Sequence, residues 1–238
     1  MPVVDVKNLV KHYGLVQAVK GINFIIDEGE IFGLIGPNGA GKTTTLRILS
    51  TLLTITSGNV QIMGYNIEKK PNEVRKIISY LPEDAGAYKN LTGKKYLEFI
   101  ANFFDEEKIK KMVSKGVEIA DLGDRITDKV DTYSKGMKRR LLVGRALMTD
   151  PKLAILDEPT SGLDVNNAQE IRNIIKNTAK IGTTVLLSSH NMLEVEYLCD
   201  RIALIDDGLI VEEGKPKDLM NKYRANNIEE VFTKVVKT

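Results

Sequence analysis

One stretch of this sequence decides how the chain folds: Gly36-Pro37-Asn38-Gly39-Ala40-Gly41-Lys42-Thr43, followed by Thr44. It matches the phosphate-binding loop pattern G-x-x-x-x-G-K-[ST], in which a strand turns through glycines into a helix. The glycines let successive backbone N–H groups point at phosphate oxygens, and the amino terminus of the helix also favours an anion. Lys42 supplies a mobile positive charge for the β- and γ-phosphates, and the Thr43 hydroxyl can ligate Mg²⁺. The stretch therefore predicts a site for the phosphates of a nucleotide.

Short apolar runs alternate with longer segments of helical periodicity on both sides of this loop. The runs expected to be strands are residues 3–6, 22–26, 31–35, 77–81, 153–156, 183–187, 202–205 and 209–211. The segments expected to be helices are residues 42–53, 94–104, 106–119, 137–148, 166–180, 192–199 and 228–237, the last one amphipathic. Several strand runs are continuously apolar, as in strands covered on both faces, so we expect an α/β fold with a largely parallel sheet.

Two regions depart from this alternation. Residues 27–30 form a short, hairpin-like connection, which predicts an antiparallel flank built from the amino-terminal strands. Residues 83–140 contain no convincing strand and carry apolar side chains at helical spacing. We expect one domain, in which a helical lobe of residues 83–140 is inserted into a catalytic α/β lobe formed by residues 1–82 and 141–238.

Length, composition and charge exclude several classes of protein. The 238 residues are 42% hydrophobic and 28% charged, which is typical of a globular chain and not of a disordered one. Because 34 Lys and Arg oppose 32 Asp and Glu, there is no chain-wide basic surface, and we expect no nucleic-acid partner. No apolar run approaches the roughly 20 residues that span a bilayer, and the start has no signal-peptide pattern. The single cysteine, Cys199, agrees with a reducing compartment.

A second chemical motif is the apolar run 153–156, which ends in Asp157 and Glu158. In phosphate-loop enzymes, a strand-end Asp holds Mg²⁺. We therefore expect Asp157 to be a metal ligand. Because side chains alternate along a strand, Glu158 is expected on the opposite side, as a base that polarises the attacking water.

Three further stretches complete a pattern: Thr132-Tyr133-Ser134-Lys135-Gly136-Met137 before a helix, Ser161-Gly162-Leu163-Asp164 after the acidic pair, and His190 at a strand end. In this order, and together with the loop and the acidic strand, they resemble the ATP-binding cassette (ABC) ATPase subunits. The resemblance covers essentially the whole chain. It is closest to the nucleotide-binding subunits of drug- or sodium-exporter-type (ABC-2 type) transporters.

The resemblance implies a fold and a role for each matching residue. The fold is a RecA-like phosphate-loop NTPase lobe with an antiparallel β flank and an inserted helical subdomain. Ser134 and Gly136 match the family signature, which contacts the γ-phosphate bound by the opposite subunit, and Asp164 matches the loop that links the two sites. His190 matches the histidine that senses the γ-phosphate and supports the water-activating carboxylate. Tyr13 matches the aromatic residue that stacks on adenine.

The resemblance also implies partners and a place in the cell. The chain would bind ATP and Mg²⁺, dimerise head to tail with a second copy or a paralogue, and drive substrate translocation, in the direction of export. It would do so on the cytoplasmic face of the membrane, where a groove around residues 83–91 receives a helix of a transmembrane permease subunit. The alternative is a soluble, non-transport ABC ATPase of the iron–sulfur assembly, translation or repair type. Translation-type relatives usually carry two cassettes in one chain, repair-type relatives carry long coiled-coil inserts, and this sequence has neither.

The sequence departs from the family pattern at three positions. Glu83 stands where Gln usually contacts Mg²⁺ and water, and an anion there changes the metal site. Lys135 stands where Gly is usual in the signature, and Met137 where Gln is usual. One hypothesis is that Lys135 of one subunit offsets the charge of Glu83 near the shared nucleotide.

Overall fold

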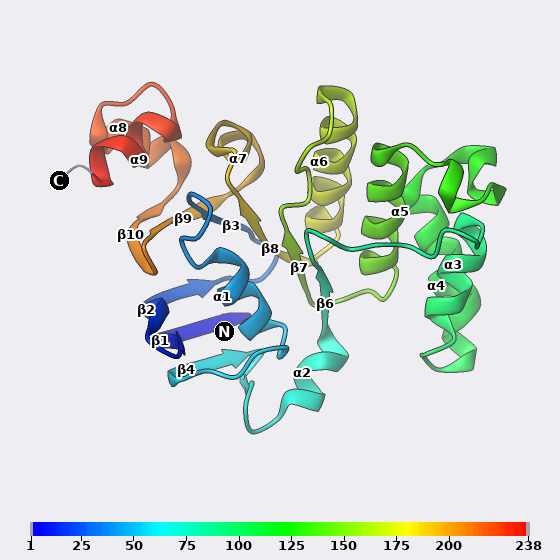
Figure 1. The fold of residues 1–238 in the computed structure, drawn as a ribbon, viewed down its shortest axis with the longest axis horizontal. Coiled ribbons are helices and arrows are strands. Elements are labelled where there is room, and N and C mark those ends of the chain that lie inside the picture. Colours follow the sequence, from blue (N-terminus) through cyan, green and yellow to red (C-terminus); the bar gives the residue numbers. More distant parts are fainter. Residues whose placement is uncertain (1, 237–238) are drawn as a thin grey trace.

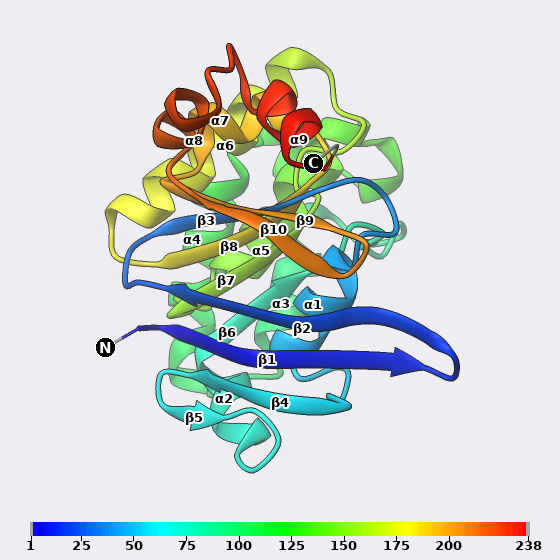
Figure 2. The ribbon, with the colours of Figure 1, turned by 90° about the vertical axis from the view of Figure 1, so that its left-hand side faces the viewer.

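The computed structural model describes residues 2–236, which form two β-sheets and the helices around and beside them (Figure 1). The smaller sheet is antiparallel, with the strand order β2 (Val16–Ile26), β1 (Val4–Tyr13), β4 (Ser57–Ile62) and β5 (Tyr65–Asn66). The larger sheet has the order β10 (Leu209–Gly214), β9 (Arg201–Asp206), β3 (Ile31–Ile35), β8 (Thr184–Ser189), β7 (Leu153–Asp157) and β6 (Ile78–Leu81). Its strands pair in parallel except for β10, which is antiparallel to β9. Figure 2 shows the two sheets as separate layers.

The helices divide between the sheets and a separate lobe. Their bounds are α1 (Lys42–Leu49), α2 (Pro71–Ile77), α3 (Gly93–Ala101), α4 (Glu106–Ala120), α5 (Lys135–Leu147), α6 (Val165–Lys180), α7 (Met192–Leu198), α8 (Pro216–Tyr223) and α9 (Ile228–Val236). Helices α3, α4 and α5 lie together at one end of the molecule, away from the smaller sheet, and form the helical subdomain (Figure 1). No helix within residues 2–236 is long and apolar enough to cross a membrane.

The core fills both faces of the larger sheet. All five residues of β3 are buried, and they alternate between two apolar clusters. Phe32 and Leu34 pack with α1 and the smaller sheet, whereas Ile31 and Ile35 pack with the helices on the other face. This alternation confirms the expectation of a sheet covered on both sides, because a central parallel strand has no solvated face. Because both faces of β3 are covered, packing also holds in place the carboxyl end of this strand, where the phosphate-binding loop begins.

The α/β fold and the helical subdomain are confirmed, but several details are different. Strands β4 and β5 and helices α2 and α8 were not predicted, because each carries few apolar side chains: within β4 only Val60 and Ile62 are buried, and within α2 only Val74. The segment 27–30 is no hairpin, because it joins β2 to β3, which lie in different sheets. The antiparallel pair is β1 with β2, which face each other up to Tyr13 and Val16 across a tight turn.

Two helices end well before the predicted residues. Helix α1 stops at Leu49 and α3 at Ala101, so the segment up to residue 104 is not helical throughout, and the exposed Phe103 lies outside α3. The carboxy-terminal helix is present to Val236, and residue 237 of the predicted segment lies outside the described residues. The predicted lobe boundary between residues 140 and 141 falls inside α5.

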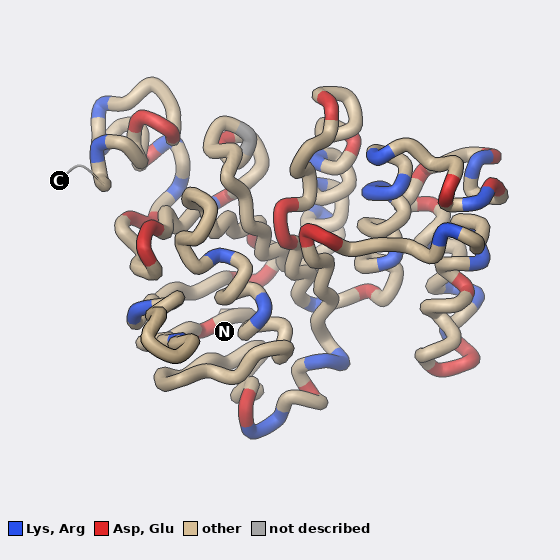
Figure 3. The backbone as a smooth tube through the Cα atoms, viewed as in Figure 1, with Lys and Arg blue, Asp and Glu red and all other residues tan. Residues whose placement is uncertain are grey.

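Charged residues of both signs are distributed over both lobes (Figure 3), in line with the formal net charge of +2.

Candidate nucleotide-binding site

The phosphate-binding loop joins the buried strand β3 to the amino terminus of α1. Gly41 precedes the helix with a φ of 104°, and a Cβ there would lie 2.5 Å from the Ala18 carbonyl oxygen, so the position requires glycine. No side chain caps the first turn of α1. Its N–H groups therefore point into the loop as donors, which suits an anion such as phosphate.

Lys42 lies beneath this loop and is only 5% exposed. Its Nζ donates hydrogen bonds to the carbonyl oxygens of Gly36, at 2.7 Å, and Pro37, at 3.1 Å. The same atom lies 3.6 Å from Oε1 of Glu158. A buried cation needs a partner charge, and here that partner is the carboxylate predicted to activate water.

Asp157 ends β7 and is 1% exposed. Its Oδ1 accepts hydrogen bonds from Ser188 Oγ, at 2.6 Å, and from Thr43 Oγ1, at 3.2 Å. The structure thus brings together the hydroxyl and the carboxylate that were predicted to hold Mg²⁺. Within residues 2–236, no cluster of three or more His, Cys, Asp or Glu side chains could hold a metal alone. This donor set fits Mg²⁺, which takes one or two protein ligands and completes its shell with phosphates and water.

Two partners of Asp157 were missed by the sequence analysis. Tyr80 of β6 donates its hydroxyl to Oδ2 at 3.4 Å, and Ser188 lies opposite Asp157 in the pairing of β7 with β8. Burial, together with the negative charge of Asp157, raises the pKa of Tyr80 to about 12, so the phenol remains a hydrogen-bond donor. Both residues lie on the strands that flank β7, so knowledge of the strand order β8-β7-β6 would have identified them.

Glu158 follows β7 directly and adopts a φ of 46°, in the left-handed region. The expectation that it continues the alternation of the strand is wrong, since the strand ends at Asp157 and the chain turns. The Glu158 N–H donates to Ser188 Oγ at 2.9 Å, and its Oε2 lies 2.8 Å from Nδ1 of His190. The carboxylate, 5% exposed, therefore lies between Lys42 and the half-exposed His190.

A cavity of about 150 Å³ lies beside the phosphate-binding loop, and its lining contains Ala18, Asn38, Gly39, Gly41, Lys42, Thr43, Thr44, Glu83 and Glu158, but neither Asp157 nor His190. Its volume suits the phosphate part of a nucleotide, since sites for whole ligands usually measure about 300 Å³ or more. Glu83, the departure from the family pattern, also accepts a hydrogen bond from Ser161 Oγ at 3.2 Å. Tyr13 is not among the lining residues; it is 46% exposed, with the Lys11 ammonium 5.2 Å from its ring centre.

The signature residues lie apart from this cavity. Ser134 caps α5, accepting from the Met137 N–H at 3.2 Å, and Asp164 caps α6 in the same way. Both are exposed. A Cβ on Gly136 would lie 2.0 Å from the side-chain oxygen of Asn167, so glycine allows the two helices to approach.

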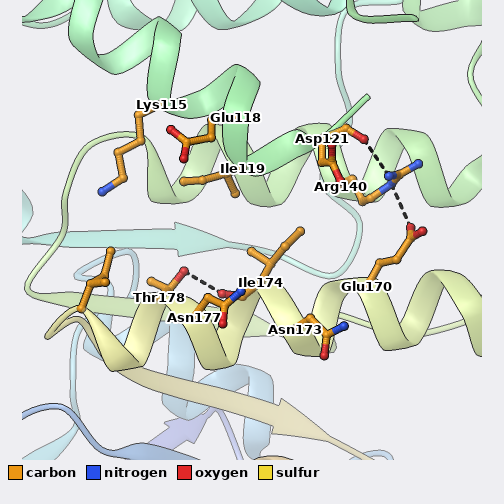
Figure 4. Close-up of a pocket in the computed structure, with 11 residues that line it drawn as sticks. Lys115, Glu118, Ile119, Asp121, Arg140, Glu170, Asn173, Ile174, Asn177 and Thr178 are labelled. Atoms are coloured by element: carbon orange, nitrogen blue, oxygen red, sulfur yellow. Dashed lines mark hydrogen bonds and ion pairs between the residues drawn. The ribbon is translucent and has the colours of Figure 1, made fainter. Parts of the chain in front are cut away.

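A different cavity, of about 460 Å³, lies between α4, α5 and α6 (Figure 4) and contains none of the predicted site residues. At its edge, Arg140 donates to the Asp121 carbonyl at 2.8 Å and lies 3.2 Å from the Glu170 carboxylate. This contact joins the helical subdomain to α6.

Sequence comparisons identify relatives of the whole chain. Residues 19–161 match a family described as ABC transporter. The linearmycin resistance ATP-binding protein LnrL of Bacillus subtilis (strain 168) is 40% identical over 224 residues, which cover 93% of this chain and 72% of the relative. The daunorubicin/doxorubicin resistance ATP-binding protein DrrA of Streptomyces peucetius is 34% identical, over 94% of this chain and 68% of the relative.

Solved structures agree with this likeness. The ATP-binding subunit of an ABC transporter superposes with a TM-score of 0.86 at 27% identity, over 98% of this chain and 99% of that one. A dimeric cassette in a post-hydrolysis state, bound to ADP and Pi, has a TM-score of 0.79 at 27% identity, over 89% of this chain and 98% of that one. The chain therefore belongs to the ABC transporter family and is one of its ATP-binding, ATP-hydrolysing subunits.

Proposed function

We propose that this chain hydrolyses Mg²⁺-bound ATP as a head-to-tail dimer and thereby drives export through a separate transmembrane permease subunit. The observation that carries the proposal is the contact of the buried Glu158 carboxylate with both Lys42, at 3.6 Å, and His190, at 2.8 Å. It supports a carboxylate that is aligned before the nucleotide binds. A site that is ordered in advance loses little free energy to reorganisation during the reaction.

The phosphate loop and Lys42 would bind the β- and γ-phosphates through N–H groups and one ammonium. Thr43 and Asp157 would hold Mg²⁺, with Glu83 at the edge of the same cavity as a further oxygen ligand. When bound, the ion neutralises charge on the phosphates. Tyr13 would stack on the adenine, a contact that tolerates the Lys11 ammonium on one ring face.

Glu158 would act as the general base, taking a proton from the attacking water. A carboxylate can only accept hydrogen bonds, so the 2.8 Å contact requires a proton on Nδ1 of His190. His190 would thus hold the carboxylate in place and leave its second oxygen near Lys42. The ammonium of Lys42 would stabilise the charge that develops on the γ-phosphoryl group.

The second half of the site would come from another subunit. Ser134 and Gly136 lie at the amino terminus of α5, a 13-residue helix whose dipole favours a phosphate placed there. Ser134 and Asp164 are exposed, so a second copy can reach them. The likeness to a dimeric cassette bound to ADP and Pi supports this arrangement.

An aromatic surface supports docking of the permease subunit. Tyr88, Phe99 and Phe103 are exposed, and Phe99 contacts the other two rings edge to face, with ring centres 5.2 Å from Tyr88 and 5.4 Å from Phe103. Tyr88 lies within the predicted docking groove around residues 83–91, and Phe99 and Phe103 extend the surface in the helical lobe that we propose at residues 83–140. A helix docked here would hold the chain on the cytoplasmic face of the membrane. The resistance functions of the relatives LnrL and DrrA, and of a relative named Nod factor export ATP-binding protein I from Rhizobium etli, support export.

The decisive experiment is Glu158→Gln in the purified chain. Because Gln keeps the shape of the side chain but cannot take the proton, we expect kcat to fall by about 1,000-fold while ATP affinity is retained. ATP should then trap a stable dimer, measured by sedimentation. Glu118→Gln, the same change at an exposed position of α4, is the matched control and should leave kcat unchanged. Normal hydrolysis by Glu158→Gln would overturn the assignment of the base.

A further inference from the structure

Arg139 is a buried arginine on α5 that no motif assigned to the site. It is 8% exposed, and its guanidinium donates to five main-chain carbonyl oxygens. The acceptors and distances are Pro159 at 2.7 Å from Nε, Pro82 at 3.3 Å and Glu83 at 3.1 Å from Nη1, and Asp157 at 2.9 Å and Glu158 at 2.8 Å from Nη2.

These contacts connect three parts of the site. Residues 82–83 follow β6, residues 157–159 run from the last residue of β7, and the two strands are neighbours in the parallel sheet. Arg139 itself lies on the helix that Ser134 caps. Only the planar fork of an arginine can present donors to both segments at once, because a lysine offers its three donors from a single atom.

The segment it holds contains the strained residue of the site. Glu158 has a φ of 46°, a region that costs a residue with a side chain free energy and persists only where the surroundings enforce it. Ser188 Oγ holds the N–H of Glu158 at 2.9 Å, while Arg139 holds the carbonyls of Glu158 and of the residues before and after it. The peptide unit between Asp157 and Glu158 is therefore held at its carbonyl group by Arg139 and at its N–H group by Ser188.

The electrostatic setting agrees with this role. Burial lowers the pKa of Arg139 from its ordinary value, and the nearby Glu83, Asp157 and Glu158 oppose that shift. An arginine keeps its charge at neutral pH even so. The cation therefore also offsets the carboxylates gathered at the ends of β6 and β7.

We infer that Arg139 is a positioning residue for ATP hydrolysis, whose fork fixes the turn at residues 157–159 so that the Glu158 carboxylate stays between His190 and Lys42. This inference rests on the proposed function, because it requires Glu158 to be the base. A positioning role predicts a loss in kcat with little change in KM, since none of the five acceptors lies in the phosphate loop at residues 36–43.

The test compares Arg139→Lys with Arg75→Lys in the purified chain. Arg139→Lys keeps the charge but loses the fork, and we expect kcat to fall about 10- to 100-fold with KM within about twofold of wild type. Arg75 is exposed on α2 and bonds Thr51 and Asn72, so the same substitution there should change neither constant. Rates are expressed per ATP-binding site, titrated with a fluorescent ATP analogue, so that misfolded chains do not count.

Arg139→Gln is the second variant, because it places no charge in the interior, and the same split between kcat and KM is expected. Adding Arg139→Lys to Glu158→Gln should cause no further loss, because the base whose position it fixes is already gone. An unchanged kcat in Arg139→Lys, or equal losses in kcat and ATP affinity, would overturn the inference. Hydrolysis by Glu158→Gln alone would instead overturn the proposed function.

Discussion

The two halves of the nucleotide site are built in opposite ways within this chain. The phosphate-loop half, which comprises Lys42, Thr43, Asp157, Glu158 and His190, takes its side chains from the start of α1 and the ends of two adjacent strands, β7 and β8. Its charged groups Lys42, Asp157 and Glu158 are at most 5% exposed. In the signature half, which comprises Ser134, Lys135, Gly136 and Asp164, both polar caps are exposed.

Burial explains the difference. A charge removed from water must find partners within its own chain, so the phosphate-loop half is fully specified by one subunit. The groups of the signature half are satisfied by their own helices and by water, and acquire a specific contact only against another surface. Substitutions in the first half should therefore change nucleotide binding and chemistry, whereas those in the second should change assembly.

Among tests of this difference between the halves, we expect the largest effect from Lys42→Ala. It removes a buried cation that contacts the loop carbonyls and Glu158, and with it the charge that meets the phosphates. We expect the Kd for ATP, measured by fluorescence titration, to rise about 100-fold. Lys108→Ala removes a lysine whose ion pair with Asp105 lies on the surface, and should leave the Kd unchanged. An unchanged Kd for ATP in Lys42→Ala would contradict the difference that we describe between the phosphate-loop half and the signature half.

An intermediate effect is expected for Ser134→Ala, made in the Glu158→Gln background. The change removes the cap of α5 and the signature hydroxyl, so the ATP-dependent dimer should weaken about tenfold while the Kd for ATP of the monomer stays within about twofold. Sedimentation at several protein concentrations measures the dimer. Thr92→Ala removes an equivalent cap from α3, where Thr92 accepts from the Lys95 N–H at 3.2 Å, and should spare the dimer. Equal weakening by both variants would mean that loss of a cap alone is responsible.

The smallest effect concerns the link between the halves inside one chain. Glu83 accepts a hydrogen bond from Ser161. A Cβ on the next residue, Gly162, would clash with the Lys135 ammonium. Glu83 and Lys135, the two residues that depart from the family pattern here, therefore both contact one loop of their own subunit. Because both side chains are exposed, we expect Glu83→Gln and Lys135→Gly each to change the ATPase rate less than about threefold. The double variant should show no coupling. A coupling of tenfold would instead support the hypothesis that the two charges offset each other.

Much of this architecture follows from sequence, and the remainder depends on which strands become neighbours. Strand β3 has the bounds predicted from its apolar run, and the acidic pair stands at the end of β7, although Asp157 is still part of that strand. The contributions of Tyr80, Ser188 and Arg139 could not be predicted, because their partners in the site lie between 18 and 77 residues away in the chain. The left-handed conformation of Glu158 could not be predicted either, because an apolar run followed by two acidic residues does not indicate where the strand ends.

The order of strands in the larger sheet also has a consequence for how this protein folds during its synthesis on the ribosome. The hydrogen bond between Thr43 and Asp157 closes a loop of 114 residues, and the contact with His190 requires β8 to have entered the sheet between β3 and β7. At a synthesis rate of about 5–20 residues per second, the phosphate loop waits on the order of ten seconds for its partners. During that time β3 lacks the strand that lies between it and β7. The groups proposed to act on the nucleotide are complete only once residue 190 has emerged, before β9 and β10 have joined the sheet, so we expect ATP to stabilise the fold late in synthesis and not earlier.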